Sequence, residues 1–316
     1  MIDYIFIIAG FVVLIVAAHF LVEGASGLAK RFNVSNLIIG LTVVAFGTSA
    51  PELVVNLVAS LNPETTDIAL TNIIGSNMIN IYVILGLSAV IFPIASQYGS
   101  RRFEIPLSFF APVLVLVLAL TMNHQINHWG AAVLFAVFVW FIYVMIKNSR
   151  KNPEFVTEEE FKPMKVWLAC LMIIGGLAGL IGGAQLIVPS ATNIALSWGV
   201  SQSVIGLTIV ALGTSLPELA TSAVAAFKKN SDIALGNVIG SNIFNVFFIL
   251  SISAFINPLP AYKNMYADLI VTASGSLLVM LFVYSNKSKE IKRWAGAILL
   301  AVYTVYLIWM IASVKI

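Results

Sequence analysis

Two passages of the chain nearly repeat each other and carry the same oxygen-bearing side chains. The first is Gly-Thr-Ser-Ala-Pro-Glu at residues 47–52, followed by Gly-Ser-Asn-Met-Ile-Asn at 75–80. The second is Gly-Thr-Ser-Leu-Pro-Glu at 213–218, followed by Gly-Ser-Asn-Ile-Phe-Asn at 240–245. Each copy places a carboxylate beside hydroxyl groups within strongly apolar sequence. Such a carboxylate is costly in a membrane and is usually retained for a function, so the two copies predict a single two-sided cation site.

The proline that precedes each carboxylate predicts a local break that exposes backbone oxygens. A proline within a helix removes one backbone hydrogen bond and clashes with the preceding turn. We therefore expect Pro51 to free carbonyl groups at residues 45–47, and Pro217 to free those at 211–213. Carbonyl oxygens freed at membrane depth must find a partner, and a cation is one such partner.

The candidate ligands in both passages are all oxygens, which narrows the class of ion. Hard cations such as Ca²⁺ and Na⁺ prefer oxygen, whereas zinc and copper sites favour His or Cys. The three histidines and the single Cys170 lie outside both passages. Ser76 and Asn80 are four residues apart, which places both side chains on one helical face, and Ser241 and Asn245 repeat this spacing.

The intervening asparagines and any single Ser or Asn of these segments have a second interpretation. Asn77 and Asn242 each follow the Ser by one residue, so they fit a role in helix breaks or interhelical bonds. Hydrogen bonding between helices is the ordinary role of polar side chains inside a membrane.

The acidic residues narrow the class of ion that the site is expected to bind. At the predicted midplane depth the acids are Glu52 and Glu218 alone, whereas Asp67 and Asp232 begin predicted helices, where the helix dipole stabilises them. Two converging carboxylates cannot easily remain ionised together without a cation. One Ca²⁺ neutralises both, and two or more Na⁺ or two protons replace it, so mutually exclusive occupancy predicts exchange. No further cofactor is expected.

The composition predicts an all-α integral membrane protein that positions these residues. The chain is 60% hydrophobic and 10% charged, whereas soluble domains carry roughly 25% charged residues. A membrane span needs about 20 mostly apolar residues. Ten stretches meet this requirement: 4–22, 36–60, 67–92, 105–122, 129–146, 166–188, 202–227, 232–256, 266–284 and 294–313.

The basic residues predict the orientation of these ten helices. All but Lys263 and Lys315 of the 17 Lys and Arg fall in the odd-numbered loops. Cytoplasmic loops carry such an excess, so we expect both termini to be extracytoplasmic. The location expected is the cell (inner) membrane, with many passes. No segment resembles a nucleic-acid-binding patch. The expected environment is the lipid bilayer, and the expected substrates are Ca²⁺ and Na⁺.

The repeat extends beyond the two passages and predicts the domain organisation. The offset between matching segments is 166 residues up to the Glu and 165 residues after it. We expect a first five-helix repeat at 1–148, a cytoplasmic linker at 149–164 and a second five-helix repeat at 165–316. Because five is odd, the second copy enters the membrane from the opposite side, which is the inverted-topology repeat of secondary transporters.

These paired passages resemble the calcium/cation antiporter superfamily, especially prokaryotic sodium/calcium exchangers. The resemblance implies an alternating-access antiporter that exchanges cytosolic Ca²⁺ for external Na⁺, with helices one and six sliding across a more static core. Matched motif by motif, it implies calcium ligands at Glu52, Glu218, Thr48 and Thr214. It also implies sodium ligands at Ser49, Ser76, Ala45, Ser215, Ser241 and Ala211, the alanines through backbone oxygens, and central-site residues at Asn80 and Asn245.

One position separates the branches of this superfamily. Several prokaryotic members and the potassium-dependent branch carry Asp where this chain has Asn245, although the potassium-dependent branch also favours the Gly-Thr-Ser-Ala-Pro-Glu form of the first passage. The missing charge weighs against potassium dependence. The proton-coupled branch carries His-containing motifs that are absent here, so a Ca²⁺/H⁺ antiporter is the second hypothesis.

Other classes of protein fit the pattern less well. A cation channel predicts symmetric rings from an oligomer, whereas an inverted pair within one chain favours alternating access. An enzyme is not expected, because no nucleophile–base pairing or metal–His motif occurs in the predicted spans.

Overall fold

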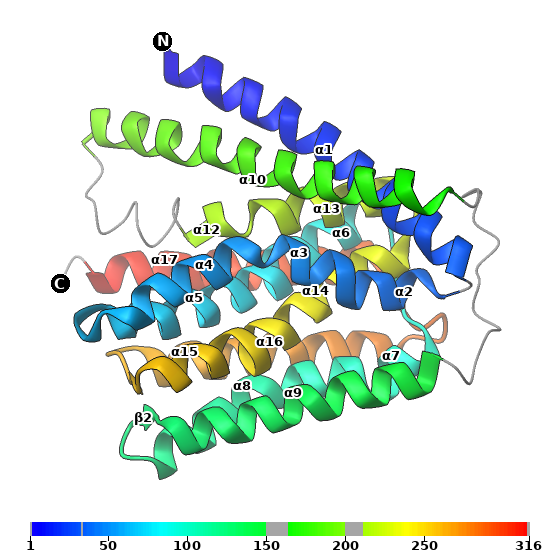
Figure 1. Cartoon of the computed structure of the whole chain (residues 1–316). Coiled ribbons are helices and arrows are strands. Elements are labelled where there is room, and N and C mark those ends of the chain that lie inside the picture. Colours follow the sequence, from blue (N-terminus) through cyan, green and yellow to red (C-terminus); the bar gives the residue numbers. More distant parts are fainter. Residues whose placement is uncertain (1, 33, 150–163, 200–210, 315–316) are drawn as a thin grey trace.

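The computed structural model describes residues 2–32, 34–149, 164–199 and 211–314. Within them the chain is almost entirely helical, and the helices lie side by side (Figure 1). The first half contains α1 (Ile2–Phe32), α2 (Asn36–Ile39), α3 (Ala45–Thr48), α4 (Ala50–Leu61), α5 (Thr66–Ile79), α6 (Leu85–Ile91), α7 (Tyr98–Arg102), α8 (Glu104–Thr121) and α9 (His128–Ser149). The second half contains α10 (Val166–Ser197), α12 (Ala211–Thr214), α13 (Leu216–Phe227), α14 (Ser231–Phe244), α15 (Leu250–Ile256), α16 (Met265–Ser285) and α17 (Arg293–Val314).

Short irregular elements connect or interrupt these helices. In the described residues, three segments have π-helical hydrogen bonding, and one connection is a turn of 3₁₀-helix. The π segments are η1 (Gly40–Val44), η3 (Asn80–Ile84) and η6 (Asn245–Ile249), and the 3₁₀ turn is η2 (Pro63–Thr65). The part of the chain that the structure describes also has four two-residue strands: β1 (Ile94–Ala95), β2 (Gln125–Ile126), β3 (Leu259–Pro260) and β4 (Glu290–Ile291).

Most of the predicted helices are long and apolar enough in the structure to span a membrane. Eight helices of the described part are long and apolar enough to cross a membrane, and a ninth span results if the pair at 36–48 and 50–61, bent by 47°, is counted as one. α13 is a shorter apolar helix. The expected seventh helix, 202–227, begins in residues 202–210, which lie outside the described residues. The all-helical membrane fold is confirmed, and the count of ten remains a prediction.

Two helices are much longer than their predicted spans. α1 extends to Phe32, beyond the expected span 4–22, and α10 extends to Ser197, beyond the expected span 166–188. Hydropathy marks where the apolar sequence ends, whereas a helix continues for as long as it has a surface to pack against. The last turns of α1 bury small residues such as Ala25 and Ala29, which provides that packing.

α1 and α10 pack against each other in opposite directions along much of their length (Figure 1). The glycines of α10 allow this close approach. A Cβ atom on Gly176 would lie 2.9 Å from the carbonyl oxygen of Ala17 and 2.9 Å from the amide nitrogen of Leu21. A Cβ atom on Gly183 would lie 3.0 Å from the carbonyl oxygen of Gly10. The two long helices therefore form one closely packed pair.

We expect Gly176→Ala to destabilise this pair, because the added methyl group meets backbone atoms that cannot move alone. The expected loss is about 1–3 kcal/mol of unfolding free energy. Gly175→Ala is the matched control, since a Cβ atom at that position would meet no neighbouring atom within 4 Å and alanine favours the helix. Thermal unfolding in detergent measures both variants. Equal midpoints for the two variants would contradict close packing at Gly176.

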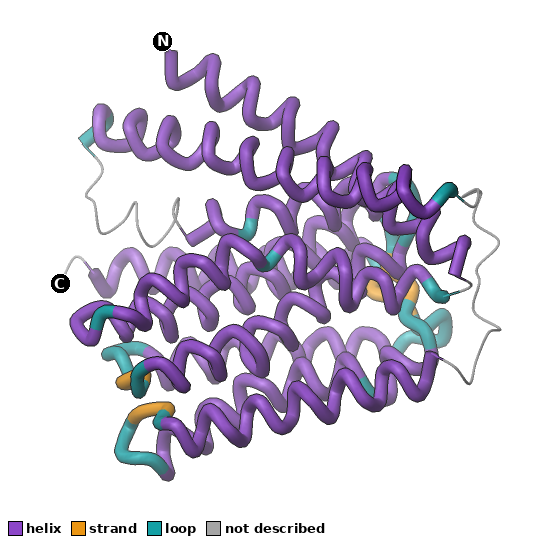
Figure 2. The backbone as a smooth tube through the Cα atoms, in the orientation of Figure 1, coloured by secondary structure: helices purple, strands orange, loops and turns teal. Residues whose placement is uncertain are grey.

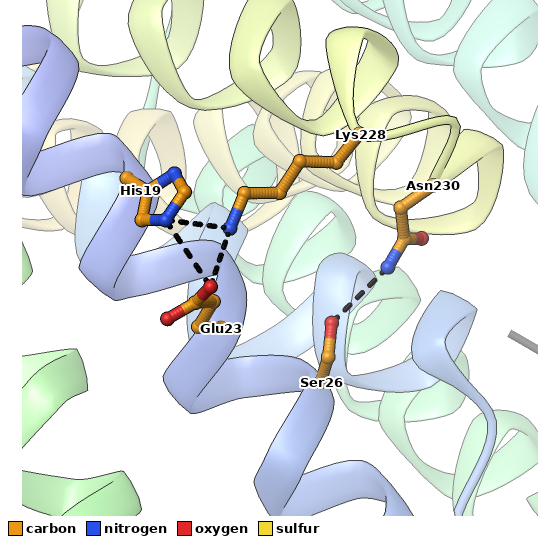
Figure 3. A network of polar contacts seen from close by, with 5 residues as sticks. All are labelled: His19, Glu23, Ser26, Lys228 and Asn230. Atoms are coloured by element: carbon orange, nitrogen blue, oxygen red, sulfur yellow. Dashed lines mark hydrogen bonds and ion pairs between the residues drawn. The ribbon is translucent and has the colours of Figure 1, made fainter. Parts of the chain in front are cut away.

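Side chains in the turn after α13 form polar contacts with α1 (Figure 3). The Lys228 ammonium donates to the Glu23 carboxylate at 3.0 Å, and His19 lies 3.1 Å from the same carboxylate oxygen. One turn further along α1, the buried Asn230 amide donates to the buried Ser26 hydroxyl at 3.1 Å. The buried bond contributes more than the partly exposed ion pair, since exposed ion pairs contribute little.

The same order of elements occurs twice along the chain. β1 and β3 begin at 94 and 259, and β2 and β4 begin at 125 and 290, so each pair of starts is 165 residues apart. The strands pair across the halves, β1 with β4 and β2 with β3, both antiparallel. Figure 2 shows the two pairs at opposite ends of the molecule. Each half thus supplies one strand to each end.

Candidate cation site

The first passage breaks its helix at the residues that the sequence indicates. α3 ends at Thr48 and α4 begins at Ala50, with Ser49 between them at φ −80° and ψ 9°. Pro51 lies at the start of α4, where a missing N–H group is tolerated. Glu52 consequently lies in the first turn of α4, where the helix dipole stabilises a negative charge.

The second passage repeats this geometry. α12 ends at Thr214 and α13 begins at Leu216, with Ser215 between them at φ −88° and ψ 5°. Pro217 lies at the start of α13 and Glu218 lies in its first turn. Both carboxylates therefore begin short half-helices inside the bundle.

The expectation that proline frees the carbonyl of Ala45 is wrong. This oxygen accepts hydrogen bonds from the Ser49 amide at 3.0 Å and from the Thr48 hydroxyl at 3.3 Å. The physical reason is the helical spacing: the N–H that Pro51 lacks would bond to the carbonyl four residues earlier, at Gly47. Ala211, the matching residue of the second passage, is the first described residue of α12.

Each carboxylate is bonded by a serine of the opposite passage. The Ser49 hydroxyl donates to Glu218 Oε1 at 3.0 Å, and the Ser215 hydroxyl donates to Glu52 Oε1 at 3.4 Å. Ser76 of α5 donates to the same Glu52 oxygen at 3.4 Å. Glu52 is 1% exposed and Glu218 is 0% exposed. The reciprocal bonds bring the two passages, far apart in sequence, into one buried cluster.

Three further hydroxyl groups lie beside the Glu52 and Glu218 carboxylates. Thr214 lies beside Glu52, and Thr48 and Ser241 lie beside Glu218. The Thr48 hydroxyl donates to Asn237 Oδ1 at 3.0 Å. The hydroxyl and carboxylate residues that the sequence predicted are thus brought together around the two acids.

Four asparagines join α5 to α14 in a symmetric network. Asn77 and Asn242 exchange bonds, each donating its side-chain amide to the backbone carbonyl of the other at 3.2 Å and 3.3 Å. Their Oδ1 atoms accept the side-chain amides of Asn245 and Asn80 respectively, both at 3.0 Å. The interhelical role predicted for Asn77 and Asn242 is confirmed. They also fix the orientation of the other two asparagines.

Five oxygen atoms of this cluster are buried and lack a hydrogen-bond partner among the described residues. They are Glu52 Oε2, Glu218 Oε2, Asn80 Oδ1, Asn245 Oδ1 and Ser241 Oγ. Buried polar atoms nearly always have a partner, so each exception requires an explanation. Carboxylate and amide oxygens are the ligands that hard cations prefer, so these buried oxygens without donors are candidate ligands.

Sequence reasoning missed a supporting layer of amides. The Asn237 amide donates to the Ser222 hydroxyl at 2.9 Å and to the Glu218 carbonyl at 3.3 Å. The Asn72 amide donates to Asn56 Oδ1 at 2.8 Å in the matching place of the first half. The signal that could have found this layer is the recurrence of Asn72 and Asn237 in matched segments of the two halves.

Two further acids, Glu104 and Asp232, are buried outside this cluster. Glu104 precedes the predicted span 105–122, but it is the first residue of α8 and is 7% exposed. Its Oε2 atom has no hydrogen-bond partner in the described part of the chain. Asp232 lies in the first turn of α14 as expected, and accepts a bond from the Gln97 amide.

Two cavities lined by described residues border the helix breaks. One, of about 400 Å³, lies between α4, α10 and α12, with Pro51 and Gln185 among its lining residues. The other, of about 270 Å³, is lined by residues that include Asn72 and Asp268. Thr214 lines both. The second passage therefore lies beside two separate openings in the packing.

Comparison with known proteins gives the family. The family model described as sodium/calcium exchanger protein matches residues 2–147 and 168–312. This chain belongs to that family. The resemblance read from the two passages is thereby confirmed, and membership places the chain among multi-pass membrane antiporters of Ca²⁺ and other cations.

Individual relatives match over nearly the whole chain. Sodium/calcium exchanger MaX1 of Methanosarcina acetivorans is 30% identical, over 97% of this chain and 98% of that protein. Inner membrane protein YrbG of Escherichia coli is 32% identical, over 95% of this chain and 94% of its own. A solved structure of the sodium-calcium exchanger NCX_Mj, soaked with Na⁺ and Ca²⁺, superimposes with a TM-score of 0.82 at 33% identity, over 96% of this chain and 97% of that one.

Proposed function

We propose that this chain is an antiporter that exchanges Ca²⁺ for Na⁺ by alternating access and exports cytosolic Ca²⁺. The observation that carries this proposal is the buried pair of Glu52 and Glu218, each bonded through one oxygen to the serine of the opposite passage. The other oxygen of each carboxylate has no partner among the described residues. The pair is therefore arranged to face a cation.

Charge explains why one ion excludes the other. Leaving two buried carboxylates uncompensated is expensive, because the interior solvates charge poorly. One Ca²⁺ neutralises both Glu52 and Glu218, and two Na⁺ supply the same charge at the same oxygens. Because the site cannot hold both sets at once, arrival of one requires departure of the other.

The proposed ligands follow the resemblance and are supported by the contacts in the site. The buried Oδ1 atoms of Asn80 and Asn245 have no hydrogen-bond partner among the described residues, so they are further uncharged oxygens that a cation could use. The proposed Ca²⁺ ligands are Glu52, Glu218, Thr48 and Thr214, with Asn80 and Asn245 as central-site residues. The proposed Na⁺ ligands are Ser49, Ser76, Ser215 and Ser241 with the backbone oxygens of Ala45 and Ala211, of which Ala45 must share an oxygen that already accepts two hydrogen bonds.

The proposed topology is ten spans in two inverted five-helix repeats, 1–148 and 165–316, joined by a cytoplasmic linker at 149–164. Supporting observations are the two separate matches to the family model and the equivalent strand pairs at opposite ends. In addition, the start of the predicted second helix lies beside the start of α14, since a Cβ atom on Gly40 would lie 3.2 Å from the Asp232 carbonyl oxygen. The basic loops support extracytoplasmic termini in the inner membrane.

Ion flux in everted membrane vesicles tests this function. Vesicles loaded with Na⁺ are expected to accumulate Ca²⁺ when diluted into Na⁺-free medium, whether or not K⁺ is present. Uptake driven equally well by a proton gradient, without any Na⁺ gradient, would favour the Ca²⁺/H⁺ antiporter instead. Uptake that needs no opposing cation would indicate a channel. Uptake that requires K⁺ would place the chain in the potassium-dependent branch.

A further inference from the structure

An acidic side chain lines the cavity that borders the second helix break. This cavity, of about 270 Å³, lies between α4, α5, α16 and α17 and has mostly apolar walls, including Val55 and Met78. Its lining also includes Asn72 and Thr214, which belong to the site and its supporting layer. Asp268, in the first turn of α16, is the single acidic residue among the described lining residues, and none of them is basic.

Two tyrosines hold this carboxylate in place. The Tyr262 hydroxyl donates to Asp268 Oδ2 at 2.7 Å, and the Tyr306 hydroxyl donates to Oδ1 at 2.6 Å. Both tyrosines also line the cavity. Burial, and then the charge of Asp268, raise the pKa of Tyr262 above its usual range, so this hydroxyl remains a neutral donor. Both bonds are donated to the carboxylate oxygens, so they favour its ionised form.

The position of Asp268 suits a cation that approaches from one face of the membrane. α16 begins and α17 ends at the end of the molecule that carries both termini (Figure 1). A negative charge in a concave, low-dielectric surface focuses the field and raises the local concentration of cations. A cation drawn to Asp268 enters the same cavity that Asn72 and Thr214 line, next to the carboxylate pair.

We propose that Asp268 is a cation recruitment residue for the exchange reaction, at the face that carries the two termini. The inference rests on the proposed function, because it gives that site an entrance. The class of ligand is a hydrated divalent or monovalent metal cation. Asp268 acts on arrival at the site and is not itself a ligand in the buried cluster.

Sided flux measurements test the proposal. The half-saturating Ca²⁺ concentration is measured on each face, in right-side-out and everted vesicles, with a protease-cleavable C-terminal tag to identify the face. Asp268→Asn is expected to raise it about three- to tenfold on the face that carries the termini, the effect of one partly screened charge. The opposite face is expected to be unchanged. Added choline chloride is expected to shrink the difference, because salt screens exposed charge.

Two variants separate recruitment from a structural role. Asp268→Glu keeps the charge and is expected to retain the normal half-saturating concentration. Tyr306→Phe keeps the charge but removes one of the two hydrogen bonds to it, so it is expected to raise this concentration less than Asp268→Asn does. The inference fails if Tyr306→Phe raises the half-saturating concentration as much as Asp268→Asn does. It also fails if Asp268→Asn changes this concentration equally on both faces, because either result would indicate a structural role for Asp268. If the unaltered chain shows no Na⁺-dependent uptake, the proposed function itself fails, which is a distinguishable result.

Discussion

Glu52→Gln is expected to abolish Na⁺-dependent Ca²⁺ uptake, and Glu218→Gln is expected to do the same. Each variant removes one of two charges that neutralise the divalent ion in a buried site. Removing one member of a buried charge pair costs about 3–5 kcal/mol, which corresponds to a loss of about 100-fold or more in affinity. Initial rates of ⁴⁵Ca²⁺ uptake into Na⁺-loaded vesicles measure the effect at matched protein levels.

Glu104→Gln is the matched control for these two variants. Glu104 is also a buried acid at a helix start, but no hydrogen bond joins it to the Glu52–Glu218 cluster among the described residues. We expect it to retain exchange, so that loss of uptake reflects the site and not the removal of any buried carboxylate. Normal uptake in either Glu52→Gln or Glu218→Gln would show that the pair is not the transport site.

Asn242→Ala is expected to produce the next largest loss. This change removes the acceptor for the Asn80 amide and the donor to the Asn77 carbonyl. Asn80 is then free to rotate, and the direction of its unpaired Oδ1 atom is no longer fixed. Loss of a group that orients a metal ligand typically costs about 10–100-fold in affinity, so the half-saturating Ca²⁺ concentration is expected to rise by that factor.

The symmetry of the network supplies an internal check. Asn77→Ala removes the equivalent bonds on the other side, to Asn245 and to the Asn242 carbonyl. It is expected to raise the half-saturating concentration by a similar factor. Both variants are compared with the unaltered chain by thermal unfolding in detergent. An unchanged Ca²⁺ dependence in a variant that is properly folded would contradict the orienting role.

Sequence predicted the chemistry of the site more completely than its geometry. The repeated passages located the two acids and the helix breaks, because a proline interrupts helical hydrogen bonding and a carboxylate is costly inside apolar sequence. The reciprocal bonds from Ser49 to Glu218 and from Ser215 to Glu52 could not be predicted from the sequence. They join residues more than 160 positions apart, and no local pattern specifies which serine meets which acid.

Helix ends were the weakest sequence predictions, and the reason is physical. The ends of α1 and α10 depend on packing between the two helices, whereas hydropathy reports only where apolar sequence stops. The expected release of the Ala45 carbonyl was wrong for a different reason. The carbonyl that a proline frees is set by the four-residue hydrogen-bond spacing, and the oxygen of Ala45 lies outside that spacing.

The number of Ca²⁺ ions bound per chain tests most directly whether the two passages form one shared site. Titration calorimetry of the purified protein, in detergent and without Na⁺, is expected to give one Ca²⁺ per chain. Glu52→Gln and Glu218→Gln are each expected to lose that single binding event. Two Ca²⁺ per chain, with one retained in each single variant, would contradict a shared site and show that the passages bind calcium independently.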